Sequence, residues 1–232
     1  DCPVIGITGS VGKTSVKDLL AAALSGTRRI TASERSFNNE LGVPLTLLSA
    51  PADAEAVVVE MGARGVGHIA QLCEIARPTI GIVTKVAAAH TEAFGGLDDV
   101  AIAKGELPAS LPADGTAILA ADDDRVLAMA ARTSARVVTF GGEGDVRAVW
   151  VELDEELRPT FTLVSPWGNA VVELPVRGRH QVDNALAAAA AALTCGLAPT
   201  EVAAGLAGAA LSPWSMELTT AASGARILND AY

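Results

Sequence analysis

Residues 4–16 read VIGITGSVGKTSV, which is a short apolar strand followed by a loop with two glycines and the beginning of a helix. Gly9 and Gly12 permit backbone conformations that turn several N–H groups toward one point. Lys13 can reach outer phosphate groups from this loop, and Thr14 offers a hydroxyl to a magnesium ion. We therefore predict a phosphate-binding loop, against the simpler alternative of an ordinary turn between a strand and a helix.

The loop departs from the general P-loop pattern at one position. That pattern has a glycine five places before the glycine that precedes the lysine, and here this position holds Ile7. Beyond the loop, apolar residues recur at intervals of three and four from Val16 to Leu24, and Gly26 follows. This spacing predicts an amphipathic helix whose N-terminus would face a bound phosphate.

The charge balance argues against one class of function. The 232 residues include 17 Lys and Arg against 27 Asp and Glu, which gives a formal net charge of −10 and no obvious basic stripe. A nucleic-acid partner is therefore not expected, although a compact anion site is compatible with this composition. Cys2, Cys73 and Cys195 form no CxxC pair, so we expect neither a disulfide framework nor a zinc site, and a reducing cytoplasm fits best.

Membrane insertion is not predicted either. The alanine-rich run at residues 185–192 is the strongest candidate for a membrane segment, but it is short, alanine is weakly apolar, and charged residues precede it. We interpret this run as a buried helix.

Strand and helix patterns alternate along the first 140 residues. Strands are predicted at residues 4–8, 56–60, 79–84, 116–120 and 136–140, and helices at 16–24, 66–77, 98–107 and 125–132. This alternation indicates an α/β fold with a mostly parallel sheet flanked by helices. Short alternating runs at 148–153, 160–164 and 170–174 then predict a small antiparallel appendage, two helices follow, and residues 216–228 resemble a hairpin.

Two candidate site residues stand just beyond predicted strands. Glu60 ends one strand and His90 follows the next, and ligands of open parallel sheets lie beyond the carboxyl ends of strands. Glu60 can meet a metal held by Thr14, or it can be a solvated acid at a strand end. A lone histidine such as His90 is more often structural or solvated than a metal ligand.

A purely structural interpretation is also open at four other positions. Cys73 falls on the apolar face of its predicted helix and is expected in the core. On composition alone, Lys104 is an ordinary surface lysine. Asn38 and Asn39 lie in a polar loop at residues 36–44, where two asparagines can simply form a turn.

Six segments in one order resemble the Mur ligases. They are residues 8–14, 37–44, 60–62, 87–90, 103–106 and 178–180. The phosphate loop of that family also lacks the first glycine, which accounts for Ile7. The resemblance implies that residues 1–211 are the central ATP-binding domain, that residues 212–232 are a linker and the start of a truncated C-terminal domain, and that a UDP-binding domain is missing before them.

The resemblance also implies a role for each matching residue. It implies nucleotide binding by Gly9, Ser10, Val11, Gly12, Lys13, Thr14, Ser15, Gln181, Asn184 and Asp230, with Gln181 standing where many members have asparagine. Thr14 and Glu60 would bind the first of two magnesium ions, and His90 would bind the second. Lys104 matches a lysine that family members carbamylate, and Lys13, His90 and Lys104 would form the catalytic set. Asn38 and Asn39 would lie on the acyl-substrate side.

The implied activity is ATP-dependent amide formation through an acyl phosphate. The residues at 37–44 and 87–90 are most similar to one branch of the family. This branch joins D-alanyl-D-alanine to a UDP-N-acetylmuramoyl-tripeptide in peptidoglycan precursor synthesis. We expect a cytoplasmic monomer that acts on these small molecules, and no activity from this piece alone. Two alternatives stay open. One is another superfamily enzyme such as a folylpolyglutamate synthetase-like ligase, and the other is a nucleotide-binding module with impaired turnover.

Two positions depart from the family pattern. Lys85 stands where relatives usually have asparagine, which is expected to place a cation beside the metal site. Ser215 stands where an arginine is expected to approach the γ-phosphate. These departures motivate the alternative of impaired turnover.

Overall fold

A six-stranded sheet organises the computed structural model, which describes residues 2–34, 37–87, 95–213 and 215–230. The strands are β1 Val4–Thr8, β2 Ile30–Ala32, β3 Ala56–Glu60, β4 Ile80–Val83, β5 Thr116–Ala120 and β6 Arg136–Phe140. They lie in the order β2-β3-β1-β4-β5-β6, and every neighbouring pair is parallel. Because β1 lies between β3 and β4, the loops after these three strands meet at one edge of the sheet, which we call the carboxyl edge.

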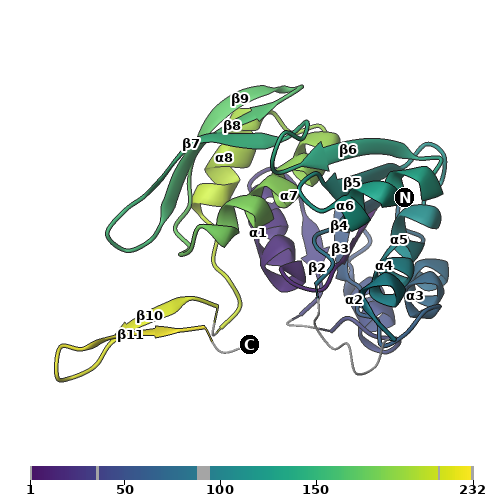
Figure 1. The fold of residues 1–232 in the computed structure, drawn as a ribbon, viewed down its shortest axis with the longest axis horizontal. Helices are drawn as coiled ribbons and strands as arrows, with labels where there is room; N and C mark the ends of the chain where they lie inside the picture. Colours follow the sequence, from purple (N-terminus) through teal and green to yellow (C-terminus); the bar gives the residue numbers. More distant parts are fainter. Residues whose placement is uncertain (1, 35–36, 88–94, 214, 231–232) are drawn as a thin grey trace.

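Helices cover both faces of this sheet (Figure 1). On one face lie α1 Lys13–Ser25 and α7 His180–Thr194, with α8 Pro199–Ala207 packed against α1. On the other face lie α2 Gly42–Ser49, α3 His68–Ala76, α4 Leu97–Lys104 and α5 Glu106–Ala109. The helix α6 Asp124–Leu127 and the 3₁₀ helix η2 Ala128–Arg132 connect β5 to β6.

The central strands are buried on both sides, as strands between two helical layers must be. Every residue of β3, β4 and β5 is buried. Successive residues of β3 point to opposite faces, so Val58 joins the core with α1 and α7, whereas Val57 and Val59 join the core with α2 and α3. This double burial holds the carboxyl edge rigidly in place.

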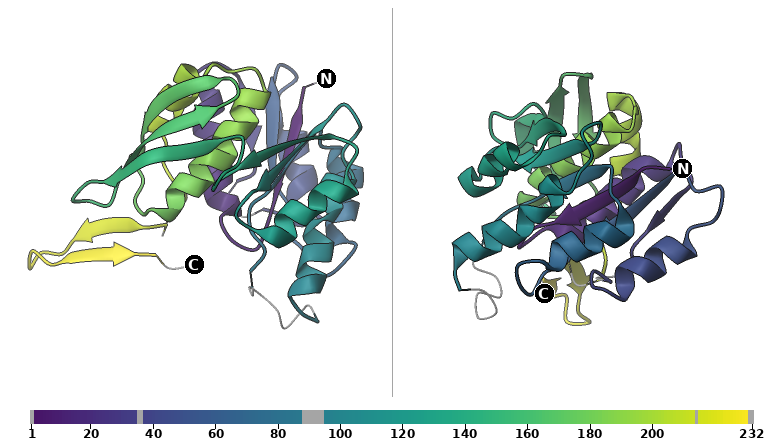
Figure 2. Two further views of the ribbon diagram at one scale, coloured as in Figure 1. Left: turned by 45° about the horizontal axis from the view of Figure 1, so that its top comes forward. Right: turned by 90° about the vertical axis from the view of Figure 1, so that its right-hand side faces the viewer.

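A smaller antiparallel sheet covers part of the α7 and α8 layer. Its strands are β7 Arg147–Leu153, β8 Pro159–Ser165 and β9 Gly168–Glu173, in the order β7-β8-β9. Phe161 and Leu163 of β8 enter the same core as α7. The final hairpin, β10 Glu217–Thr220 with β11 Arg226–Asn229, extends away from the rest of the molecule (Figure 2).

The predicted fold class is confirmed, including the parallel sheet, the helices on both faces and the antiparallel appendage. The alanine-rich run lies in α7, where Ala185 and the residues up to Leu193 are buried, and Cys73 is buried in the core as expected. The predicted strand ranges agree with β5 and β6 at both ends.

Several local features differ from what the sequence indicated. The three-residue edge strand β2 is too short to give a period-two pattern, and the sequence did not indicate it. The predicted loop at residues 36–44 extends too far, because α2 begins at Gly42. The single helix expected at 98–107 is two helices separated at Gly105, since Pro108 has no N–H to donate to the carbonyl of Lys104 four residues earlier.

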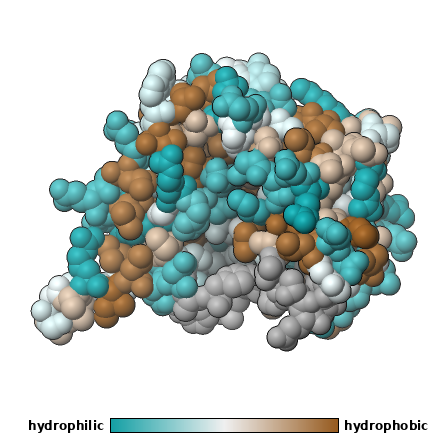
Figure 3. Space-filling model, in the orientation of Figure 1, coloured by the Kyte–Doolittle hydropathy of each residue, from teal (hydrophilic) through white to brown (hydrophobic). Residues whose placement is uncertain are grey.

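Among the described residues, no helix has both the length and the apolar character needed to cross a membrane. On the face seen in Figure 3, hydrophilic residues lie between several separate hydrophobic patches.

Candidate functional site

The loop after β1 has the backbone that its glycines predict. Gly9 has φ +146° and Gly12 has φ +84°, and both values disfavour side chains with a Cβ. A Cβ on Gly9 would collide with the hydroxyl of Thr84, which follows β4. A Cβ on Gly12 would lie 2.5 Å from Oδ1 of Asn184 on α7. Residues 9–12, which we call the glycine loop, therefore need glycine at both positions because neighbouring elements approach so closely.

The end of β4 fixes the glycine loop through hydrogen bonds. Ser10 N–H donates to the Lys85 carbonyl at 2.7 Å, and the Thr84 hydroxyl donates to the Val11 carbonyl at 2.6 Å. Thr84 carried no functional prediction from the sequence. Its position at the end of the buried strand β4, at the carboxyl edge, was the signal that could have identified it.

Two side chains of the loop region are buried there. The Ser10 hydroxyl oxygen has no hydrogen-bond partner among the described residues, although the residue is only 6% exposed. The ammonium of Lys13 donates to the Gly9 carbonyl at 3.0 Å and therefore lies back over the loop. Burial lowers the pKa of Lys13, and the negative charge of Glu60 opposes that change. Both side chains would gain from an acceptor-rich anion placed at the loop.

Glu60 connects three elements at the carboxyl edge. Its Oε2 accepts a hydrogen bond from the Thr14 hydroxyl at 2.9 Å, and its Oε1 accepts one from Asn38 Nδ2 at 2.8 Å. The residue is 1% exposed, so the solvated strand-end interpretation of Glu60 is wrong. The structure brings Thr14, Glu60 and Asn38 together as one polar cluster beside Lys13.

Lys104 is not the surface lysine that composition indicates, because it is 4% exposed at the end of α4. Burial, the largest cause, and the positive charge of Lys13 together lower its pKa to about 8, and the negative charges of Glu106 and Glu60 oppose this change. Four ionisable groups from the start of α1, the end of β3 and the α4–α5 junction thus influence one another. A lysine with this pKa has a substantial neutral fraction near pH 7.

The first turn of α7 approaches the glycine loop from the side. Asn184 Nδ2 donates to Gln181 Oε1 at 2.9 Å, which holds the Asn184 side chain against Gly12. Gln181 is buried, and its Nε2 lies 3.1 Å from the ring Nε2 of His180. The two predicted residues Gln181 and Asn184 are therefore neighbours of the loop.

Other predicted site residues have different surroundings. Ser15 lies in the first turn of α1. Asn39 Oδ1 accepts the N–H groups of Leu41 and Gly42 and so caps the start of α2. Asp230 follows the last strand and accepts the Met216 N–H at 3.2 Å. His90 lies outside the described residues.

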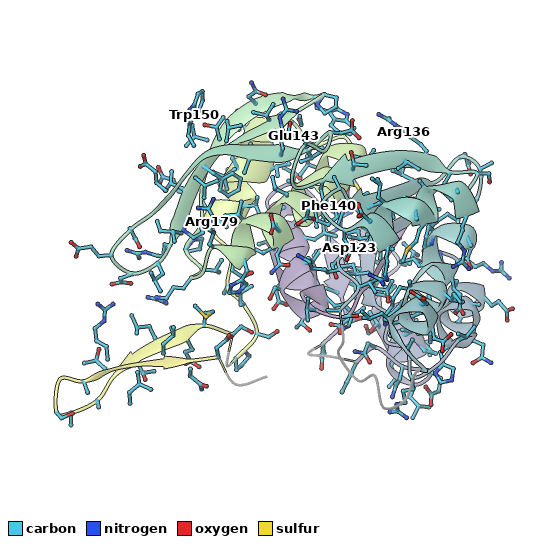
Figure 4. The ribbon with its side chains drawn as sticks, in the orientation of Figure 1. Asp123, Arg136, Phe140, Glu143, Trp150 and Arg179 are labelled. Atoms are coloured by element: carbon cyan, nitrogen blue, oxygen red, sulfur yellow. The ribbon has the colours of Figure 1, made fainter. Side chains whose placement is uncertain are left out.

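Lys85 forms an ion pair with Asp122, which lies in the loop after β5. Its ammonium is 3.7 Å from Asp122 Oδ2, and the side chain is half exposed. Desolvation raises the pKa of Asp183 nearby, the charge of Asp122 raises it further, and Lys85 opposes that change. Asp123, labelled in Figure 4, accepts the Val86 N–H at 2.8 Å and so holds the chain just after Lys85. The cation of Lys85 is thus partly compensated by acids that the sequence analysis did not single out.

No group of three or more His, Cys, Asp or Glu residues that could hold a metal ion occurs in the described parts of the chain. Two oxygen donors nevertheless lie side by side at the carboxyl edge. Thr14 supplies a hydroxyl and Glu60 a carboxylate. These hard oxygen ligands suit magnesium, which usually takes only one or two carboxylates from a protein.

A parallel sheet with a glycine loop after its first strand, and with a lysine and a threonine opening the next helix, defines a P-loop-type domain. The sequence matches the family described as the Mur ligase middle domain over residues 7–192. The chain therefore belongs to the Mur ligase middle domain family.

Individual relatives agree with this family assignment. The UDP-N-acetylmuramoyl-tripeptide–D-alanyl-D-alanine ligase of Mycobacterium tuberculosis is 48% identical over 232 residues, which cover 99% of this chain and 46% of that protein. MurF from Acinetobacter baumannii superposes with a TM-score of 0.95 at 33% identity, covering 100% of this chain and 51% of that one. MurF from Thermotoga maritima in complex with ADP gives a TM-score of 0.87 at 27% identity, with 100% and 54% covered. The chain thus spans about half the length of the relatives it matches.

Proposed function

We propose that this chain is the ATP-binding part of a ligase that joins D-alanyl-D-alanine to a UDP-N-acetylmuramoyl-tripeptide in peptidoglycan precursor synthesis. The main support for this proposal is the cluster at the carboxyl edge, where the Thr14 hydroxyl donates to Glu60 at 2.9 Å beside the buried Lys13 and Lys104. The names of the relatives support the D-alanyl-D-alanine branch over a folylpolyglutamate synthetase-like enzyme. In this proposal, residues 1–211 form the ATP-binding domain and residues 212–232 begin the next one.

The glycine loop would hold the phosphates of ATP. Its main-chain N–H groups and the N-terminus of α1 favour negative charge. The buried Ser10 hydroxyl could donate to a phosphate oxygen, and the Lys13 ammonium needs only to leave the Gly9 carbonyl. An MurF relative that binds ADP supports the choice of nucleotide. The remaining loop residue, Val11, would contribute its N–H group, and Ser15 would face the phosphates from the first turn of α1.

The residues around Glu60 would hold two magnesium ions. Thr14 and Glu60 would bind the first ion, and His90 with a carbamate on Lys104 would bind the second. Bound magnesium would offset the negative charge that develops as the γ-phosphoryl group transfers. The depressed pKa of Lys104 supports the carbamate, because only the neutral amine reacts with carbon dioxide.

The remaining residues would bind and orient substrates. Asn38 would stand on the acyl-substrate side with its amide already fixed by Glu60, and Asn39 would place that loop by capping α2. Gln181 and Asn184 would lie near the adenine, and Asp230 near the nucleotide at the junction with the next domain. The peptide carboxylate would attack the γ-phosphorus and displace ADP to give an acyl phosphate. The amine of D-alanyl-D-alanine would then attack the acyl carbon and displace inorganic phosphate. Lys13 would stabilise the transferring charge.

The expected setting is a cytoplasmic monomer that takes only small molecules as partners. Its substrates would be ATP, the UDP-linked tripeptide and D-alanyl-D-alanine. All three are anionic or zwitterionic, which suits a site built from cations and main-chain N–H groups.

A second candidate is a domain that binds ATP without turning it over. It is favoured by Ser215, which offers no positive charge where the family pattern has an arginine, and by Lys85, which places a cation where relatives usually have asparagine. The deciding experiment is product formation by the full-length parent protein with candidate UDP-peptides and D-alanyl-D-alanine. Amide product supports the ligase. Calorimetric binding of MgATP without phosphate release supports the second candidate, and absence of MgATP binding refutes both.

A further inference from the structure

A second buried lysine lies one turn beyond the glycine loop on α1. Lys17 is 4% exposed, and the proposed mechanism gives it no role. It stands three residues after Thr14, so the two side chains lie on neighbouring positions of one helix face. Burying an ammonium group costs free energy unless the group is paired and hydrogen-bonded. The partners of Lys17 therefore show which chain segments it connects.

The first partner of Lys17 is the end of β2. Its ammonium donates to the Ser33 carbonyl at 2.9 Å. The hydroxyl of the same Ser33 accepts the Glu60 N–H at 3.2 Å. Glu60 in turn accepts from Thr14 on α1. The four residues close a ring of contacts that fixes the acid of the carboxyl edge against the first two turns of α1.

The second partner is the adjacent acid. The Lys17 ammonium lies 2.9 Å from Asp18 Oδ1, and only 14% of the Asp18 side chain is exposed. The other oxygen of Asp18 accepts two hydrogen bonds from Ser212, one from its N–H at 2.7 Å and one from its hydroxyl at 2.8 Å. Ser212 opens the segment that leads from the α8 layer into the β10–β11 hairpin (Figure 1).

We propose that Lys17 and Asp18 are positioning residues that couple the segment beginning at Ser212 to Glu60. Asp18 anchors that segment on the helix that carries Thr14, and Lys17 transmits the constraint to Ser33. This inference rests on the proposed function, because Glu60 matters here as the acid beside the nucleotide phosphates.

Charge makes this anchor specific. Hydrogen bonds to a carboxylate are stronger than bonds between neutral groups, and Asp18 receives three donors from two chain segments. Its neutralisation would leave Lys17 without a counter-charge in a buried position. A change at the Ser212 segment should therefore affect Glu60, and a change at Glu60 should affect the segment. Because such coupling is reciprocal, anchoring of the Ser212 segment and binding of MgATP at the glycine loop should favour each other.

The test uses the whole 232-residue chain with three variants, Asp18→Asn, Ser212→Ala and the charge-conserving Lys17→Arg, and one matched control. Asp18→Asn removes the carboxylate, whereas Ser212→Ala removes a single hydroxyl and leaves the Lys17–Asp18 pair intact. Asp154→Asn is the control, because Asp154 is likewise a carboxylate that accepts two hydrogen bonds, in its case from main-chain N–H groups at 2.9 and 2.8 Å in the distant β7–β8 turn. Amide hydrogen exchange of Ser212 and the calorimetric Kd for MgATP are measured for each.

We expect Asp18→Asn to accelerate exchange of the Ser212 amide by roughly tenfold or more, since a charge-assisted bond is lost. We expect its Kd for MgATP to rise about fivefold or more, the lower end of usual couplings between sites. Ser212→Ala should change both quantities in the same direction by less, Lys17→Arg should keep the wild-type Kd, and Asp154→Asn should change neither quantity.

Three results would overturn the inference. Unchanged exchange at Ser212 in Asp18→Asn shows that no anchor exists. Faster exchange with an unchanged Kd in both Asp18→Asn and Ser212→Ala shows a purely structural contact. If Asp18→Asn does not fold, Ser212→Ala alone decides between these outcomes. Failure of the wild-type chain to bind MgATP refutes the proposed function and this inference together, which distinguishes that case from the other two.

Discussion

Replacing Lys104 with methionine should stabilise the chain near neutral pH. The side chain is 4% exposed, and methionine has a similar length without the charge. Folding lowers the pKa of Lys104 from 10.5 to about 8, and at 1.36 kcal/mol per pH unit this difference amounts to about 3 kcal/mol. Lys104→Met removes that cost, so its free energy of unfolding at pH 7 should exceed the wild-type value by up to about 3 kcal/mol.

The sign of the pH dependence follows from proton binding. Below pH 8, Lys104 is protonated in the folded and the unfolded chain, and the wild type carries the whole cost. Between pH 8 and 10.5 the folded chain releases its proton first, so the unfolded chain binds more protons and the free energy of unfolding rises with pH. Lys104→Met lacks this rise. The advantage of the variant should therefore fall below about 1 kcal/mol by pH 10.

Urea unfolding at pH 7 and pH 10 measures this difference, in buffers free of carbon dioxide, nucleotide and magnesium. Lys85→Met is the control for losing a lysine, because Lys85 is half exposed. A difference between Lys104→Met and wild type that stays constant from pH 7 to pH 10 would refute the assigned cause.

The same pKa leaves roughly one Lys104 amine in ten neutral at pH 7, against roughly one in three thousand at the ordinary value. Carbon-13 NMR with labelled bicarbonate and magnesium should therefore show a carbamate, and an unmodified lysine would reject that proposal.

Three further outcomes are expected. Lys13→Ala should weaken MgATP binding by about 1.5 to 3 kcal/mol without unfolding the chain, and an unchanged affinity in calorimetry would reject its phosphate contact. Glu60→Gln should weaken binding of MgATP more than binding of ATP without magnesium, and equal losses would argue against a role at the metal. In the full-length parent, Ser215→Arg should raise single-turnover phosphate release more than it tightens ATP binding, because an arginine acts mainly on the transferring charge. No gain from this change or from its combination with Pro213→Arg would mean that Ser215 is not at the family's arginine position.

Local spacing was enough to predict the central features of the fold. The glycine loop required a strand before it and a helix after it, and the structure has β1 and α1 there. Continuous apolar runs predicted the buried strands, because residues between two helical layers are apolar on both sides. The pairing of Thr14 with Glu60 could be anticipated as well, since both follow strands that end at the same edge of a parallel sheet.

Burial of single polar residues could not be read from spacing. Lys104 has the composition of a surface residue, and only the packing of α4 and α5 over the sheet removes it from water. Asn38 and Asn39 are adjacent and chemically identical, yet one donates to Glu60 and the other caps α2. These roles depend on where β3 and α2 lie in space, which is information that a nine-residue loop does not contain. The paired acid Asp18 and its partner Ser212 are 194 residues apart, and no local pattern connects them.

The cluster around Glu60 fixes the direction of the Thr14 hydroxyl, so this hydroxyl would not need to rearrange in order to bind a metal. A hydroxyl that donates its single proton keeps two lone pairs, and the proton of Thr14 is directed to Glu60 Oε2 at 2.9 Å. The lone pairs of Thr14 are therefore oriented by the carboxylate before any ligand binds. Asn38 occupies Oε1 in the same way, and each carboxylate oxygen still has a further acceptor position. Because Glu60 is almost fully buried between α1 and α2, this orientation is set when the chain folds, so binding at the loop would not have to supply the cost of ordering it.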